Sequence, residues 1–283
     1  MNKIKYTIIA IIFFCISSVS CTKEDTPQQN IKIKTEIAAF ADLQKQLTDY
    51  NKSFGISETR GFWSFIKAIY TVAADVIGGI KGYGNKKSIS GAITGAVGAS
   101  AAAYGGWEVA IPFSGTSIGK PIKGYDCLDC VDRIDSLGII HNEILIELYQ
   151  EDSTLFVLGN GPALFLAIKL KSEEHYPDID FTDVDATFIQ EIADSVNTAI
   201  FESDNMSIAI SRLKNSNPEI SAELDIIEIL FYGIAEIEDD EAFFNYIDGF
   251  KNIVMDSDIP EESKEVIRIG LAIVLGSKQL WQN

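Results

Sequence analysis

Histidine is nearly absent from this chain, which has only His141 and His175 in 283 residues. The sequence also contains neither the H-E-x-x-H motif of zinc proteases nor the G-x-x-x-x-G-K-[ST] loop that binds phosphates. No nucleophile therefore has an evident base, and His141 with Asp135 or Glu143 is the candidate acid–base pair. We expect a protein without catalytic residues. An enzyme whose residues meet only in the fold is the alternative.

Positive charge is also scarce. The chain has 23 Lys and Arg against 41 Asp and Glu, a formal net charge of −18. A charge of this sign opposes binding to nucleic-acid backbones and to anionic lipid surfaces, so nucleic acid is not an expected partner. The acids are spread over several predicted helices, which is typical of the solvated face of an exported protein.

The N-terminus has the charge and hydropathy pattern of an export signal. Lys3 and Lys5 precede an uncharged apolar run over residues 6–16, which is too short to span a bilayer, and Ser18-Val19-Ser20-Cys21 follows. This pattern resembles a bacterial lipoprotein signal, in which Cys21 becomes the lipidated first residue of the mature chain; Ser18 stands where leucine is usual. Thr22-Lys23-Glu24-Asp25 resembles the tag of surface-exported lipoproteins of Bacteroidetes.

The resemblance implies a signal peptide at 1–20, palmitate or a similar lipid on Cys21, and an outer-membrane protein at the cell surface, with a periplasm-facing protein as the alternative. Loss of Lys3 and Lys5 takes the net charge to −20. Residues 21–32 are too polar to bury apolar surface and are expected to form a flexible tether. The expected partners are the membrane, through the lipid, and a protein of the envelope. An ordinary signal peptide or a single anchoring helix remains an alternative.

Only Cys127 and Cys130 remain inside the mature chain once Cys15 leaves with the signal. Thiols outside the cytoplasm tend to oxidise, so a local disulfide is expected. A thioredoxin-like site would need a βαβ context that the surroundings do not provide. A zinc site with His141 is disfavoured because eleven helical steps separate His141 from Cys130, about 16 Å. No metal or cofactor other than the lipid is expected.

Apolar residues three and four apart predict an all-α helical bundle, with one helical region at 33–150 and a second bundle at 151–283. Helices are expected over 33–54 and 61–77, and Gly78-Gly79 is expected to break the second. In the C-terminal half, Pro162 suits the first turn of a helix, Thr182 is the expected cap of the next, and Asn217-Pro218 is a start signal. The acids over 178–185 do not match an EF-hand.

Residues 88–107 carry no charge and overlap a glycine-rich segment, 78–106. If 88–107 is helical, a ridge of small residues follows one face, as in a glycine zipper. The segment resembles glycine-rich parts of some bacteriocins and pore-forming peptides. We expect a helical hairpin buried in the protein; a membrane-active segment and a loose loop are the alternatives. The ridge consists of Gly91, Gly95, Gly98, Ala102 and Gly105.

A clear helix is predicted over residues 132–150, with His141 on its apolar face and therefore in the core. Within it Gly138, His141 and Asn142 form a Gly-x-x-His-Asn motif. The motif resembles one found in uncharacterised secreted proteins of Bacteroidetes, where it also follows a glycine-rich segment. That resemblance implies no known activity. We therefore predict a lipid-anchored protein with a binding role, and a bacteriocin-like or toxin-like effector using residues 88–107 is the second hypothesis.

Overall fold

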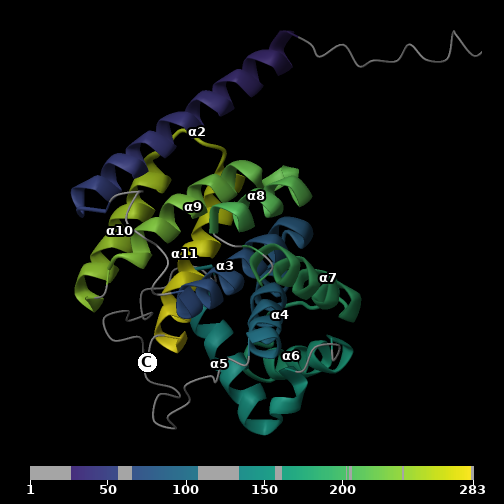
Figure 1. Ribbon diagram of the computed structural model, residues 1–283. Helices are drawn as coiled ribbons and strands as arrows, with labels where there is room; N and C mark the ends of the chain where they lie inside the picture. The colour runs from purple at the N-terminus through teal and green to yellow at the C-terminus, as the bar shows by residue number, and fades with distance from the viewer. Residues whose placement is uncertain are drawn as a thin grey trace, which may run out of the picture. The chain divides into compact units, whose positions relative to one another are not determined.

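The described residues of the computed structural model are 27–56, 66–107, 134–156, 161–201, 203, 206–237 and 239–281. Within these residues all regular structure is helical, which confirms the predicted all-α bundle (Figure 1). The chain divides into two compact units, 1–39 and 40–283. Every contact discussed below lies within the second unit. The α-helices are α2 (Pro27–Ser53), α3 (Ile66–Lys86), α4 (Ile89–Trp107), α5 (Leu137–Glu151), α6 (Gly161–His175), α7 (Ala186–Val196), α8 (Met206–Ser216), α9 (Ser221–Ala235), α10 (Asp240–Asp256) and α11 (Glu261–Trp281).

The glycine-rich hairpin is formed by α3 and α4, whose backbones touch. A Cβ on Gly95 would lie 2.1 Å from the carbonyl oxygen of Gly78, and one on Gly82 would lie 2.0 Å from that of Gly91. Gly78-Gly79 was predicted to end the helix over 61–77, and this prediction was wrong because α3 continues to Lys86. The helix tolerates these glycines because Gly78 admits the backbone of α4 and Gly79 admits Ile273 of α11, which offsets their low helix propensity.

Two residues make the turn of the hairpin. Lys87 has a φ of 53°, a left-handed conformation that ends α3, and its N–H donates to the carbonyl oxygen of Tyr83. Ser88 then caps α4, since its Oγ accepts from the N–H of Gly91 at 3.1 Å. The turn is therefore specified by local chemistry at both helix ends.

Helix α4 is enclosed by its neighbours and packs against α3, α5, α6 and α7 (Figure 1). The predicted ridge of small residues does not face one partner. Gly91 and Gly95 face α3, whereas a Cβ on Gly98 would lie 3.5 Å from Ile189 of α7. Ala102 is buried, and Gly105 lies in the last turn of α4. Because α4 is surrounded, its small residues contact more than one neighbouring helix.

The last helix joins the two regions that the sequence separates at residue 150. Helix α11 packs against α3 and α5 from the first region and against α9 and α10 from the second. A Cβ on Gly79 of α3 would lie 2.0 Å from Cδ1 of Ile273 in α11. The core of residues 40–283 is therefore continuous across residue 150.

Helix α2 begins at Pro27, inside the stretch expected to be a tether, and its C-terminal half docks on α9 and α10. The side chain of Asn51 donates to the carbonyl oxygen of Ile229 at 3.0 Å and accepts from the hydroxyl of Tyr246 at 2.8 Å. Tyr50 and Tyr246 stack with ring centroids 5.5 Å apart. Burial raises the pKa of Tyr246 far above its ordinary value, so its hydroxyl stays a donor.

Two helix starts differ from their predictions. The cap of α7 is Asp185, whose Oδ1 accepts from the N–H of Phe188 at 3.0 Å; the side chain of Thr182 donates to Asp180 instead. Pro218 begins a 3-10 turn, and α9 follows only from Ser221. Pro162 lies in the first turn of α6, as predicted.

We predict that Gly95→Ala lowers the free energy of unfolding by about 1–3 kcal/mol, because its Cβ meets backbone that cannot rotate away. The matched control is Gly98→Ala, where the added Cβ makes ordinary van der Waals contact and alanine favours the helix. Urea unfolding followed by circular dichroism measures both. Equal effects of the two changes would contradict the close α3–α4 contact.

Candidate functional site

A cluster of polar side chains lies in the apolar core where α3, α4, α5 and α11 meet. Asp75, Ser100, His141 and Ser277 each come from a different one of these helices, and each has 0% of its surface exposed. Polar groups buried to this extent are stable only when hydrogen-bonded. This cluster is therefore the place in the described chain where reactive side chains are brought together.

The carboxylate of Asp75 is the centre of the cluster. Its Oδ1 accepts a short hydrogen bond from Ser100, and its Oδ2 accepts from Ser277 at 2.8 Å. The Nε2 atom of His141 lies 2.9 Å from Oγ of Ser100 and 3.8 Å from Oδ2 of Asp75. The order of contact is thus acid, serine, histidine.

The Gly138-x-x-His141-Asn142 motif places the histidine in this cluster. A Cβ on Gly138 would lie 2.1 Å from the carbonyl oxygen of Ala272, so α5 and α11 meet backbone to backbone at this point. One turn later, Nδ2 of Asn142 donates to the carbonyl oxygen of Gly276 at 2.8 Å, and Oδ1 of Asn142 lies 2.9 Å from Nδ1 of His141. Gly138 therefore allows the close contact between α5 and α11. Asn142 fixes the register of these two helices and the orientation of the His141 ring.

This order differs from that of a hydrolase triad. There the acid holds the histidine through its second ring nitrogen and the histidine activates the serine. Here Asn142 occupies that nitrogen, while Asp75 contacts Ser100 directly. With the four side chains of the cluster enclosed, the arrangement in this conformation holds four helices together.

The acids proposed as partners of His141 lie elsewhere. Asp135 accepts from Lys251 at 3.0 Å and from Arg268 at 3.2 Å. Glu143 accepts a short hydrogen bond from the hydroxyl of Tyr176. The hypothesis of a His141–Asp135 or His141–Glu143 pair was therefore wrong, because Asp135 precedes α5, Glu143 lies off its buried face, and Asp75 of α3 takes their place.

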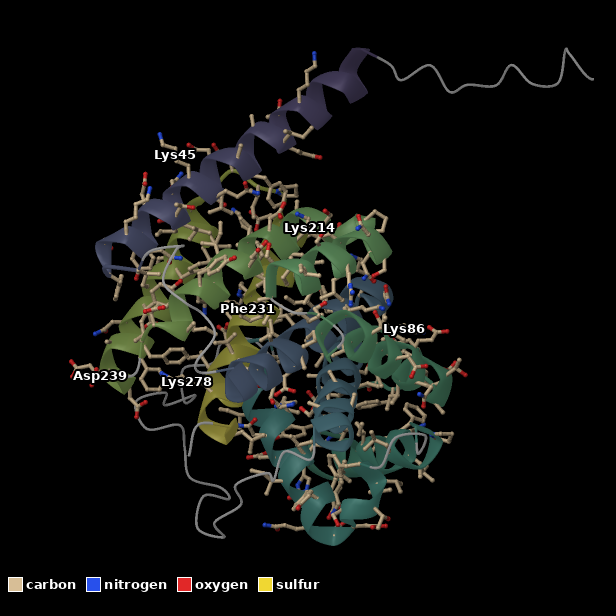
Figure 2. The ribbon with its side chains drawn as sticks, in the orientation of Figure 1. Lys45, Lys86, Lys214, Phe231, Asp239 and Lys278 are labelled. Atoms are coloured by element: carbon tan, nitrogen blue, oxygen red, sulfur yellow. The ribbon has the colours of Figure 1, made fainter. Side chains whose placement is uncertain are left out.

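Lys278 follows Ser277 on α11 but points to the turn before α10, near Asp239 (Figure 2). Its ammonium lies 3.8 Å from the ring centroid of Phe243 and donates to the carbonyl oxygen of Ile237. Burial lowers the pKa of Lys278, while Asp240 and Asp239 oppose the shift. The partners of the Lys278 ammonium therefore lie outside the Asp75–Ser100–His141–Ser277 cluster.

The acids over 178–185 have partners within the fold. Asp180 accepts from the N–H and the hydroxyl of Thr182, and this lowers its pKa. Asp183 accepts from Ser90 of α4 at 2.9 Å. Among the described residues, no three histidine, cysteine or acidic side chains are grouped closely enough to hold a metal ion.

Several candidate residues lie outside the described residues: Cys21, Cys127 and Cys130. The pentapeptide Gly115-Thr116-Ser117-Ile118-Gly119 also lies there. It has the G-x-S-x-G spacing of a nucleophile elbow, which the sequence reasoning missed. That motif acts at a strand-to-helix turn in hydrolases, so the spacing alone does not assign a nucleophile here.

Asp75, Ser100 and Ser277 were also missed, although one signal was present. Asp75 is the only acid within the predicted apolar helix 61–77, and a carboxylate in such a helix requires buried donors. The donors lie 25 and 202 residues away in sequence, so no local pattern connects them.

No protein-family model, curated protein or solved structure matches this chain.

We predict that Ser277→Ala lowers the free energy of unfolding by about 1–3 kcal/mol, because the Asp75 carboxylate loses a buried donor. Ser216→Ala is the control, since this exposed serine donates to carbonyl oxygens of its own helix and accepts only from the adjacent Asn217 side chain. Denaturant unfolding of the two variants gives the comparison. A loss at position 277 no larger than at 216 would contradict the role of the cluster.

Proposed function

We propose that this chain is a lipid-anchored helical protein of the bacterial outer membrane that acts by binding a protein of the envelope. The observation that carries the proposal is the Ser18-Val19-Ser20-Cys21 sequence after a charged start and a short apolar run. The Lys-Glu-Asp tag after Cys21 favours the cell surface, and a periplasm-facing protein is the alternative.

A binding role is supported by the burial of the reactive side chains. Ser100, His141 and Asp75 are enclosed and contact one another, so the surface that meets a partner is made by other residues. The mature surface carries a net charge of −20, which favours a partner with basic side chains and opposes nucleic acid. The lipid supplies the contact with the membrane, and no other cofactor is proposed.

We predict that wild-type protein expressed in a bacterium incorporates labelled palmitate and that Cys21→Ala does not, because Cys21 carries the lipid. Cys130→Ala is the control, since it removes another thiol while leaving the signal intact. Mass spectrometry of the N-terminal peptide should find a lipidated residue 21. Palmitate incorporation by Cys21→Ala, or an unmodified N-terminus beginning elsewhere, would contradict the proposal.

Cells that express the wild-type protein can also be used to determine which face of the outer membrane the protein occupies. Protease added to intact cells should remove α11, detected with an antibody to the C-terminus, if the protein is at the cell surface. Protection of α11 until the outer membrane is permeabilised would place the protein in the periplasm.

A membrane-active effector is the second candidate. The observation that favours it is the hairpin, in which the 19 residues of α4 carry no charge and other helices cover them. Against it, none of the described helices combines the length and the apolar character needed to cross a bilayer. Asp75 and Lys81 of α3 would also have to leave their partners.

We predict that the purified mature chain without its lipid releases no dye from lipid vesicles beyond the leakage of vesicles alone. Gly98→Ala should behave in the same way, since it leaves the α3–α4 contact intact. Dye release by the folded wild-type chain would favour the effector over the binding protein.

A further inference from the structure

The direction of one hydrogen bond fixes a proton on His141. The carbonyl oxygen of Gly276 can only accept, so the amide nitrogen of Asn142 faces it at 2.8 Å. The amide oxygen of Asn142 must then face Nδ1 of His141, at 2.9 Å. An amide oxygen cannot donate, so Nδ1 carries a hydrogen.

A second proton follows from the hydroxyl of Ser100. This hydroxyl has a single hydrogen, which it donates to Oδ1 of Asp75. The 2.9 Å contact between Oγ of Ser100 and Nε2 of His141 is then a hydrogen bond only if Nε2 is the donor. With hydrogens on both nitrogens, the His141 ring is an imidazolium.

We propose that Asp75 and His141 form a buried ion pair, bridged by Ser100, that latches the α3–α4 hairpin to α5 and α11. The carboxylate accepts from Ser100 and from Ser277, one hydroxyl to each oxygen. Hydrogen bonds to the charged form of a carboxylate favour that form. Each N–H of the imidazolium also has an acceptor, so the pair satisfies the hydrogen-bonding needs of the ring without water.

Two described lysines of the helices around the pair have partners away from it. Lys81 of α3 lies near Glu191 and Glu219, and Lys278 of α11 contacts the ring of Phe243. Helix α4 carries no charged residue. Separating the hairpin from α5 or α11 therefore leaves one charge in the core without its counter-ion, which makes the pair a latch and not a surface contact.

Nitrogen NMR of the full-length protein with 15N-labelled histidine tests the charge. The chain has two histidines, so His175→Gln, which removes an exposed contact with Glu147 and a ring contact with Tyr176, assigns the signals of His141. We expect both ring nitrogens of His141 to be protonated, each with a slowly exchanging hydrogen. An unprotonated Nε2, which would mean a neutral ring accepting from Ser100, overturns the ion pair. This measurement uses a native core and does not depend on the folding of a core variant.

Native-state hydrogen exchange tests the latch. Asp75→Asn and His141→Gln should each speed exchange of the α3 and α4 amides by on the order of 100-fold or more, because each leaves a buried charge unpaired. The double variant should exchange no faster than the more affected single variant. Effects that multiply would overturn the coupling. Should a single variant fail to fold, Ser100→Ala, which keeps both charges, takes its place, and unchanged hairpin exchange in it would overturn the bridge.

Discussion

The contact between the backbones of α3 and α4 is the constraint on which the rest of the structure depends. Two helices approach this closely only where neither carries a Cβ, and the glycine pairs Gly78/Gly95 and Gly82/Gly91 provide that contact. The same device recurs between α5 and α11, where a Cβ on Gly276 would lie 2.3 Å from the carbonyl oxygen of Gly138. Two backbone contacts therefore set the positions of four helices.

The polar cluster lies between these two contacts and depends on the accurate helix positions that they set. A buried carboxylate is tolerated only if its donors lie within hydrogen-bond distance, and a shift of one helix by a fraction of a turn would remove Ser100 or Ser277 from Asp75. Apolar contacts alone permit such shifts at small cost, because hydrophobic attraction is not directional. The cluster thus selects one register among several that the small side chains of α4 would allow. This is the best-attested role of buried polar groups in helical proteins.

Helical content could be predicted from the sequence because a period of three and four is a local property. The all-α class, the hairpin and the burial of His141 follow from it. The end of α3 could not be predicted, since Gly78-Gly79 breaks an isolated helix and is stabilised here by contacts with α4 and α11. The cluster required knowledge of which helices meet. Asp75 and Ser277 come from opposite ends of the chain, and Asp135 was closer in sequence to His141 than the acid that contacts it.

The same contacts bear on whether the hairpin belongs in the protein or in a membrane. Helix α4 carries no charge, so no charged side chain of its own opposes its entry into lipid. Helix α3 carries Asp75 and Lys81, and each charged side chain costs roughly 2.5–3.5 kcal/mol at the centre of a bilayer on insertion scales. Asp75 would also lose two hydroxyl donors and the nearby ring of His141. The two arms pack against each other through glycine, so α4 cannot leave without exposing the backbone of α3. Helix α3, which carries charged side chains, therefore keeps the uncharged helix α4 packed in the core of the protein.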